Sequence, residues 1–80
     1  MTIDRVRKLI TDNFEIPPEH SDLPEDLPFV ESHLLDSLDM LSLVSLVEAE
    51  FDVPVRDEDV LLDNFGTVGR IAAYVDRRSA

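Results

Sequence analysis

Apolar side chains recur at helical spacing at both ends of the chain, which predicts one amphipathic helix at each end. In residues 3–14 the apolar positions are Ile3, Val6, Ile10 and Phe14, and near the C-terminus they are Val68, Ile71, Ala72 and Val75. Thr2 and Thr67 precede these stretches and are the expected N-caps, because a hydroxyl oxygen can accept from the unpaired N–H groups of a first helical turn. Both apolar stripes are expected to face the core.

The strongest helical signal covers residues 37–51, SLDMLSLVSLVEAEF, which contain neither glycine nor proline. Asp36 and Asp39 have the spacing of an N-cap and its return partner in a capping box. A helical turn of about 100° per residue places one set of apolar side chains on a single arc. We expect this arc to be buried, and its members are Met40, Leu43, Val44, Val47 and Phe51. The same projection leaves Leu38, Leu41, Leu46 and Ala49 outside the arc.

Prolines separate the first two predicted helices. Four of the five prolines, Pro17, Pro18, Pro24 and Pro28, fall between residues 17 and 28. Each one fixes φ and removes a backbone donor, so no regular helix crosses this stretch. We expect a long ordered loop whose apolar side chains are anchored in the core, namely Ile16, Leu23, Leu27 and Phe29.

The remaining segment predicts one short helix over residues 57–63, with acidic side chains in its first turn and Gly66 at its end. No stretch shows sustained apolar and polar alternation, so no sheet is expected. The sequence therefore predicts an all-α fold, a bundle of three main helices and one short helix with a long loop between the first and second.

Length and charge limit the functional classes. The 80 residues predict a single domain over 1–80, with no cysteine to reinforce its core. A net charge of −11 disfavours nucleic acid and anionic membranes and favours a basic protein partner. No apolar run is long enough to span a bilayer, and the N-terminus lacks the features of a secretory signal. We expect a soluble, cytoplasmic, monomeric protein, and Met1 with the short tail favours a free-standing chain.

The acidic side chains are concentrated in the middle of the chain. Residues 11–69 carry 16 acidic side chains and only one basic side chain, Arg56. Such a surface can serve solubility alone or can dock a basic partner, and the charge by itself does not choose between them.

The candidate for chemistry is Ser37 in the segment LLDSLD, at the first turn of the strongest predicted helix. A helix N-terminus has unpaired N–H groups and favours negative charge, so a phosphate ester on this hydroxyl would be stabilised there. Asp36 and Asp39 would repel such an ester. A lone serine in this position is also explained as a second capping residue.

The order of these features resembles the acyl carrier protein family. The similarity runs from about Phe29 to Val75 and includes L-D-S-L, E-x-E-F-D-V-P-V-x-D-E-D and N-F-G-T-V, whereas residues 1–14 match only in helical pattern. The resemblance implies that Ser37 receives 4'-phosphopantetheine from coenzyme A through a magnesium-dependent phosphopantetheinyl transferase. It also implies a non-catalytic carrier that holds acyl or aminoacyl groups as thioesters for loading enzymes and for downstream transferases or synthases.

The helix that starts at Ser37 also supplies the expected docking surface for partners with basic surfaces. The candidate docking residues are Asp36, Leu38, Asp39, Leu41, Ser42, Ser45, Glu48 and Ala49. Ser42 and Ser45 stand where many fatty-acid carriers have Glu and Met. The segment ESHLLDSL is closer to stand-alone carriers of polyketide, nonribosomal-peptide and D-alanyl pathways, in which glycine commonly occupies the position of His33.

Three other functions are compared with that of a carrier protein. A serine hydrolase is disfavoured because the residues around Ser37 lack the glycines of a nucleophile elbow, and His33 is expected to be an exposed loop residue. A metal site is disfavoured because Asp57, Glu58 and Asp59 lack the ligand spacing of a calcium loop. An acidic helical interaction module without a prosthetic group shares nearly every feature of the carrier and remains open.

Overall fold

The computed structural model describes residues 1–79 and is all-helical over that range. Its elements are α1 (Thr2–Asn13), the 3₁₀ turn η1 (Pro18–His20), α2 (Ser37–Phe51), the 3₁₀ turn η2 (Asp57–Asp59), α3 (Leu62–Phe65) and α4 (Val68–Ser79). No β-strand occurs in residues 1–79. The expected fold class, three main helices and one short helix, is confirmed.

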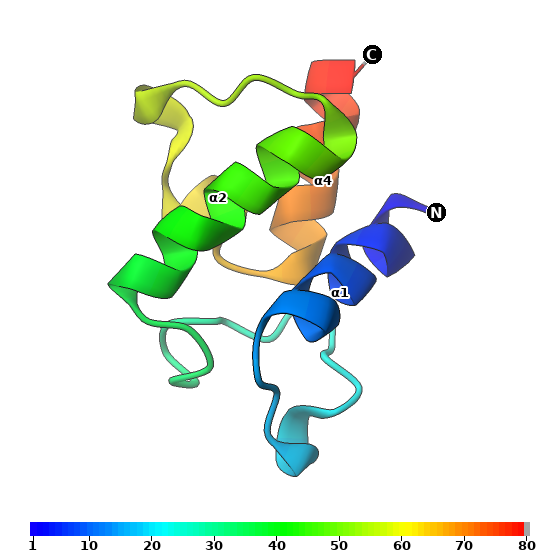
Figure 1. Cartoon of the computed structure of the whole chain (residues 1–80), viewed down its shortest axis with the longest axis vertical. Helices are drawn as coiled ribbons and strands as arrows, with labels where there is room; N and C mark the ends of the chain where they lie inside the picture. The colour runs from blue at the N-terminus through cyan, green and yellow to red at the C-terminus, as the bar shows by residue number, and fades with distance from the viewer. Residues whose placement is uncertain (80) are drawn as a thin grey trace.

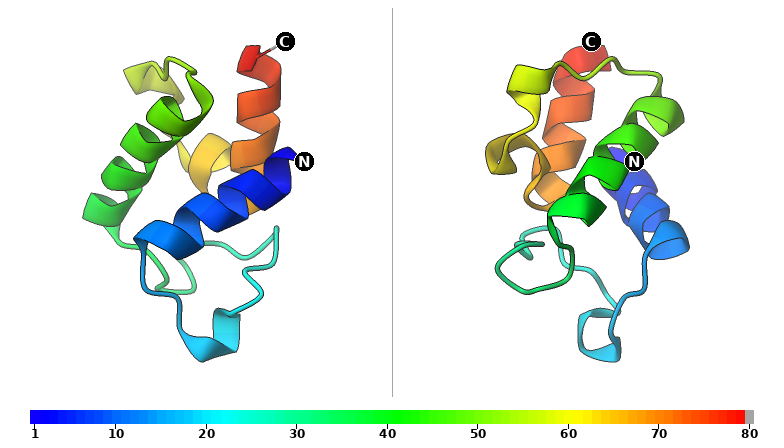
Figure 2. Two further views of the ribbon diagram at one scale, coloured as in Figure 1. Left: turned by 45° about the vertical axis from the view of Figure 1, so that its right-hand side comes forward. Right: turned by 60° about the vertical axis from the view of Figure 1, so that its left-hand side comes forward.

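The three long helices form a bundle in which α1 packs against both α2 and α4 (Figure 1). The short α3 packs against α4. Figure 2 shows the long α1–α2 loop closing one end of the bundle, while the segment that follows α2 crosses the opposite end before it descends to α3. No helix among the described residues is both long and apolar enough to cross a membrane.

The buried face of α2 follows the predicted arc, with small differences at its edges. Leu43, Val44 and Val47 are buried, and Met40 and Phe51 are partly buried against the same core. Leu46 was expected outside the arc but also packs partly against the core. Leu46 is partly buried because the core contacts a wider face of α2 than the predicted arc.

The long loop is anchored as the sequence predicts. Leu23 and Phe29 are fully buried, and Ile16 and Leu27 pack against the core. Two backbone hydrogen bonds tie the loop to the α3–α4 junction: the Phe29 N–H donates to Gly66 O at 3.0 Å, and the Gly69 N–H donates to Glu25 O at 2.9 Å. The loop is therefore part of the folded body and fixes the direction from which the chain enters α2.

Two local expectations need correction. Thr2 is the first residue of α1 and does not cap it, because Met1 occupies the N-cap and the Thr2 hydroxyl donates to Asp76 at 2.7 Å. The single helix expected over residues 57–63 is two elements, η2 and α3. Leu61, with φ −130° and ψ 154°, is extended and separates them.

The C-terminal signals are confirmed. Thr67 caps α4, since the Arg70 N–H donates to its Oγ1 at 3.1 Å. Gly66 ends α3, where an added Cβ would collide with the Leu62 carbonyl. Val68, Ile71, Ala72 and Val75 are all buried, as their spacing predicts.

Tyr74 is a buried residue that the apolar stripe of α4 did not include. Its ring packs on Phe65 with centroids 5.2 Å apart, and its hydroxyl donates to Asp59 Oδ2 at 2.8 Å. Asp59 also pairs with Arg56 at 3.6 Å. Tyr74 thus fastens η2 to α4, a contact between residues that are distant in sequence.

Replacing Tyr74 with phenylalanine is expected to lower the free energy of unfolding by about 1–2 kcal/mol at neutral pH, because Asp59 loses its buried donor. Burial, followed by the hydrogen bond to Asp59 and the charge of that carboxylate, raises the pKa of Tyr74 above its ordinary value of 10.0. Urea denaturation of both proteins at neutral and alkaline pH measures the difference in stability.

The sign of the pH effect follows from the raised pKa. The stabilisation by Tyr74 is fully present below the pKa of the unfolded state, about 10, and is lost as pH rises through the higher folded-state value. The advantage of the wild type over Tyr74→Phe should therefore shrink in strong alkali. A constant difference across that range would contradict the role given to the Tyr74 hydroxyl.

Candidate functional site

The site begins with the capped N-terminus of α2. Asp36 adopts an extended conformation, and its Oδ1 accepts from the Asp39 N–H at 2.8 Å. In return the Asp39 carboxylate accepts from the Asp36 N–H at 3.2 Å. Both halves of the predicted capping box are present, so the start of α2 is fixed by two reciprocal hydrogen bonds.

Ser37 is the first residue of α2 and is exposed. Because Asp36 caps the helix, the Ser37 hydroxyl is not needed for capping, and no hydrogen bond among residues 1–79 uses it. The N–H groups of Ser37 and Leu38 are likewise unpaired within the described residues, as expected for the first turn of a helix. This geometry presents a nucleophilic oxygen to solvent at the positive end of a helix dipole.

Two hollows flank Ser37. One, of about 300 Å³, is lined by Val30, His33, Leu35 and Asp36 together with Ser37. The other is an apolar groove of about 450 Å³. Its lining residues besides Ser37 are Val30, Met40, Leu41, Val60, Leu61, Leu62 and Phe65. A group attached to Ser37 therefore has a partly polar space on one side and an apolar space on the other.

The apolar groove is lined in part by exposed apolar residues that the sequence did not assign to the site. Leu61 and Leu62 are 54% and 52% exposed, and Val30 is also exposed. The spacing within residues 57–63 gave no reason to expect them near Ser37, because only the packing of α3 brings them across from α2. The available signal was a run of three apolar residues, 60–62, in a segment too short to bury them all.

Most of the candidate docking residues on α2 are exposed. Leu38 and Leu41 are 74% and 60% exposed, so the long loop does not cover them. The residues Asp36, Ser42, Ser45 and Ala49 are also exposed, whereas Asp39 is half-buried in the capping box. The side of α2 that carries them is available for contact from Ser37 onward.

Glu48 differs from the other candidates. It is half-buried, and its carboxylate accepts from the Val55 N–H at 3.1 Å. This bond anchors the segment between α2 and η2 to the helix. Glu48 therefore has a structural partner within the chain, which its position in the sequence did not indicate.

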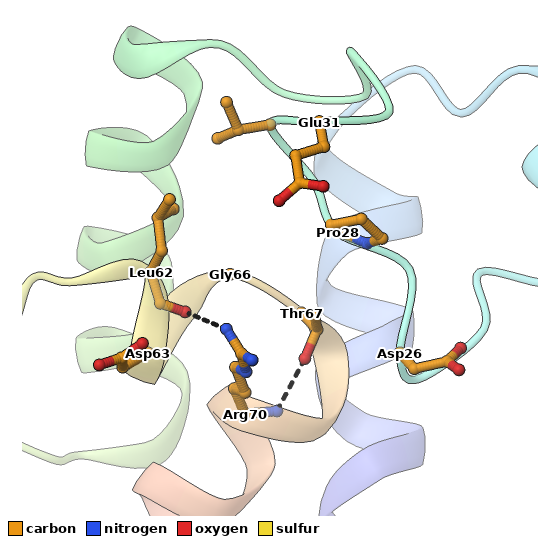
Figure 3. Close-up of a pocket in the computed structure, with 9 residues that line it drawn as sticks. Asp26, Pro28, Glu31, Leu62, Asp63, Gly66, Thr67 and Arg70 are labelled. Atoms are coloured by element: carbon orange, nitrogen blue, oxygen red, sulfur yellow. Dashed lines mark hydrogen bonds between the residues drawn. The ribbon is translucent and has the colours of Figure 1, made fainter.

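A third pocket, of about 360 Å³, lies between the long loop and the α3–α4 junction and is lined in part by Asp26, Glu31 and Asp63 (Figure 3). The Arg70 guanidinium projects into it and donates to Leu62 O at 3.2 Å. Ser37 does not line this pocket. Arg70 joins α3 to α4 and balances part of the surrounding negative charge.

The arrangement at Ser37 fits a covalently attached phosphate ester. The hydroxyl is exposed, unpaired N–H groups lie beside it, and neighbouring hollows offer space for a flexible chain. Among residues 1–79, no group of three or more His, Cys, Asp or Glu side chains is placed to hold a metal ion.

Comparison with known families identifies the class. The model of the phosphopantetheine attachment site matches residues 4–75, nearly the whole chain. The chain therefore belongs to this family, whose members carry a covalently attached 4'-phosphopantetheine.

Two curated relatives refine the class. The chain is 30% identical over 79 residues to the acyl carrier protein of Zymomonas mobilis subsp. mobilis, covering 99% of this chain and 96% of the relative. It is 29% identical over 73 residues to the acyl carrier protein of Wolinella succinogenes, covering 91% of each. The chain is an acyl carrier protein by family, a non-catalytic carrier that a phosphopantetheinyl transferase modifies.

Proposed function

We propose that Ser37 carries the 4'-phosphopantetheine arm and that the thiol of the arm holds acyl or aminoacyl groups as thioesters. The observation that supports this most directly is the exposed Ser37 hydroxyl at the capped start of α2, with a hollow on each side. The thiol belongs to the arm, so a chain without cysteine can carry a thioester.

The attachment step requires only the Ser37 hydroxyl from this chain. Its Oγ attacks the β-phosphorus of coenzyme A, and the bond from that phosphorus to the bridging oxygen of the nucleotide breaks. The products are a phosphodiester on Ser37 and adenosine 3',5'-bisphosphate, and the hydroxyl proton passes to a base of the transferase. The exposed first turn of α2 gives the transferase access to this oxygen.

The pathway is proposed to be a specialised one, such as polyketide, nonribosomal-peptide or D-alanyl transfer, rather than primary fatty-acid synthesis. The support is the presence of Ser42 and Ser45, both exposed, where many fatty-acid carriers have Glu and Met. A partner that binds this side of α2 therefore contacts two serine hydroxyls, where such a fatty-acid carrier has a glutamate carboxylate and a methionine thioether. In this proposal the loading enzyme selects the acyl or aminoacyl cargo. The protein acts in the cytoplasm.

We further propose that partners dock on an apolar surface that extends beyond α2. Four leucines are exposed: Leu38 and Leu41 on α2, and Leu61 and Leu62 at the start of α3. All but Leu38 line the apolar groove beside Ser37. The acidic side chains around them favour fast, reversible encounters with basic partner surfaces. A shuttle needs such weak docking because it must leave each partner after transfer.

Leu41→Ala is expected to raise the KM of the transferase for the unmodified protein several-fold, because truncating a buried interface leucine removes apolar contact area. Its free energy of unfolding should stay within about 0.5 kcal/mol of the wild type, since the side chain is exposed. Steady-state kinetics of phosphopantetheinylation measure the effect. Ala73→Ser, an exposed change on α4, is the control and should leave the KM unchanged.

The test of the carrier function is intact-protein mass spectrometry after incubation with coenzyme A, magnesium and a broad-specificity phosphopantetheinyl transferase. The proposal expects the addition of one phosphopantetheine, mapped by fragmentation to Ser37. Using an acyl-coenzyme A in place of coenzyme A should give a product that releases its acyl group with neutral hydroxylamine. A folded protein that no transferase modifies would instead support the acidic interaction module.

A further inference from the structure

A histidine in a strained conformation stands four residues before Ser37. His33 has a φ of 61°, in the left-handed region that residues other than glycine seldom adopt. Its N–H donates to Val30 O at 3.1 Å and closes a turn of the long loop. The side chain is exposed, and no hydrogen bond or ion pair among the described residues uses its imidazole. The turn fixes the backbone, and the exposed imidazole is accessible to a group outside the fold.

His33 and Ser37 border the same space. Both line the hollow of about 300 Å³, together with Val30, Leu35 and Asp36. A phosphodiester formed on Ser37 Oγ begins at the wall of this hollow. A phosphodiester whose non-bridging oxygens enter this hollow would lie beside His33.

The charge around the hollow explains why an imidazole matters there. Asp36 lines the hollow. Glu31 and Asp39 lie close in sequence to its lining residues, so every ionisable side chain of residues 31–39 other than His33 is a carboxylate. The hollow is lined by neither lysine nor arginine. Arg56, the one basic side chain of residues 11–69, is already paired with Glu58 and Asp59. Of the side chains that line this hollow, only the His33 imidazole can become positively charged, so it can add to the first-turn N–H groups of α2 in offsetting the charge of a phosphodiester at Ser37.

We infer that the His33 imidazole contacts the phosphodiester of the arm, donating an N–H to a non-bridging oxygen and holding the arm against the first turn of α2. This inference rests on the proposed attachment at Ser37. The contact strengthens when the imidazole gains its second proton, because the imidazolium then offsets the charge of the phosphodiester. His33 thereby holds the base of the arm, and holds it more strongly as the imidazolium.

The test is ³¹P NMR of the phosphopantetheinylated protein over a pH range of about 5.5 to 8, where histidine ordinarily titrates. A phosphodiester keeps one negative charge throughout this range, so a step in its ³¹P shift reports a neighbouring group. The wild type should show a step that coincides with the titration of the His33 imidazole resonances. Those resonances should also shift between the unmodified and modified proteins.

The variants separate charge from backbone effects. His33→Asn and His33→Asp both place residues that tolerate the left-handed conformation, so the turn is kept while the titrating ring is removed. Both are expected to lose the ³¹P step. His20→Asn is the control, because His20 lies in η1 and lines neither hollow beside Ser37, and this variant should keep the step.

Either of two results would overturn the inference: a ³¹P profile of His33→Asn that matches the wild type, or His33 resonances of the wild type that are equal before and after modification. Failure of the proposed function has a different signature, because mass spectrometry then finds no phosphopantetheine on Ser37 and no ³¹P signal arises. Circular dichroism of each variant checks that the helical fold is kept.

Discussion

Replacing Ser37 with alanine is expected to abolish phosphopantetheine attachment while leaving the fold intact. The hydroxyl is the proposed nucleophile, and alanine offers no oxygen to form the phosphodiester. Asp36, not Ser37, caps α2, and alanine is a good helix former, so the free energy of unfolding should change by less than about 0.5 kcal/mol. Intact-protein mass spectrometry and urea denaturation measure the two quantities separately.

The matched controls are two other exposed serines of α2. Ser42→Ala and Ser45→Ala remove the same hydroxyl from the same helix. Both lie on the proposed docking surface, so the rate of modification can change, but at completion both should still accept one phosphopantetheine. Modification of a folded Ser37→Ala protein would move the attachment to another residue. Loss of modification in all three variants would mean that the transferase is sensitive to the surface of α2 rather than to one nucleophile.

Replacing Phe29 with alanine is expected to remove most of the stability of the protein. Its ring is fully buried, and its main chain ties the loop together: Phe29 O accepts from Leu34 N–H at 2.9 Å and from Leu35 N–H at 3.1 Å. Loss of a buried phenylalanine costs about 3–5 kcal/mol. Because a fold of this size has only about 5 kcal/mol in total, the variant should be largely unfolded at moderate temperature. Urea denaturation followed by circular dichroism measures the loss.

Two comparisons make this prediction specific to burial. Phe51→Ala truncates the same kind of ring, but Phe51 is only partly buried and lies under the Arg5 guanidinium at 4.5 Å. It should cost about 1–2 kcal/mol, from lost apolar contact and the lost cation–π interaction. Phe29→Leu should recover part of the lost stability by refilling the space. Equal effects of Phe29→Ala and Phe51→Ala would show that the loop is not held in the core as described.

The local structure around the candidate site was predicted correctly where it depends on near neighbours. The capping box joins Asp36 and Asp39, which are three residues apart, and the exposure of Leu38 and Leu41 follows from the helical projection. Contacts between distant residues were missed. Glu48 bonds to Val55, and Leu61 and Leu62 reach the groove beside Ser37 only through the packing of α3. A helical projection describes one element and carries no information on what packs against it.

The sequence alone determined the helical class, the bounds of α2 and the position of its cap, because these depend on apolar spacing, proline and hydrogen bonds between near neighbours. It also predicted that Phe29 anchors the long loop. Only the tertiary structure decided that Tyr74 fastens η2 to α4 through Asp59 and that His33 takes a left-handed φ beside the Ser37 hollow. Both depend on how the loops are fitted around the packed helices, which sets distances between residues that sequence spacing leaves free.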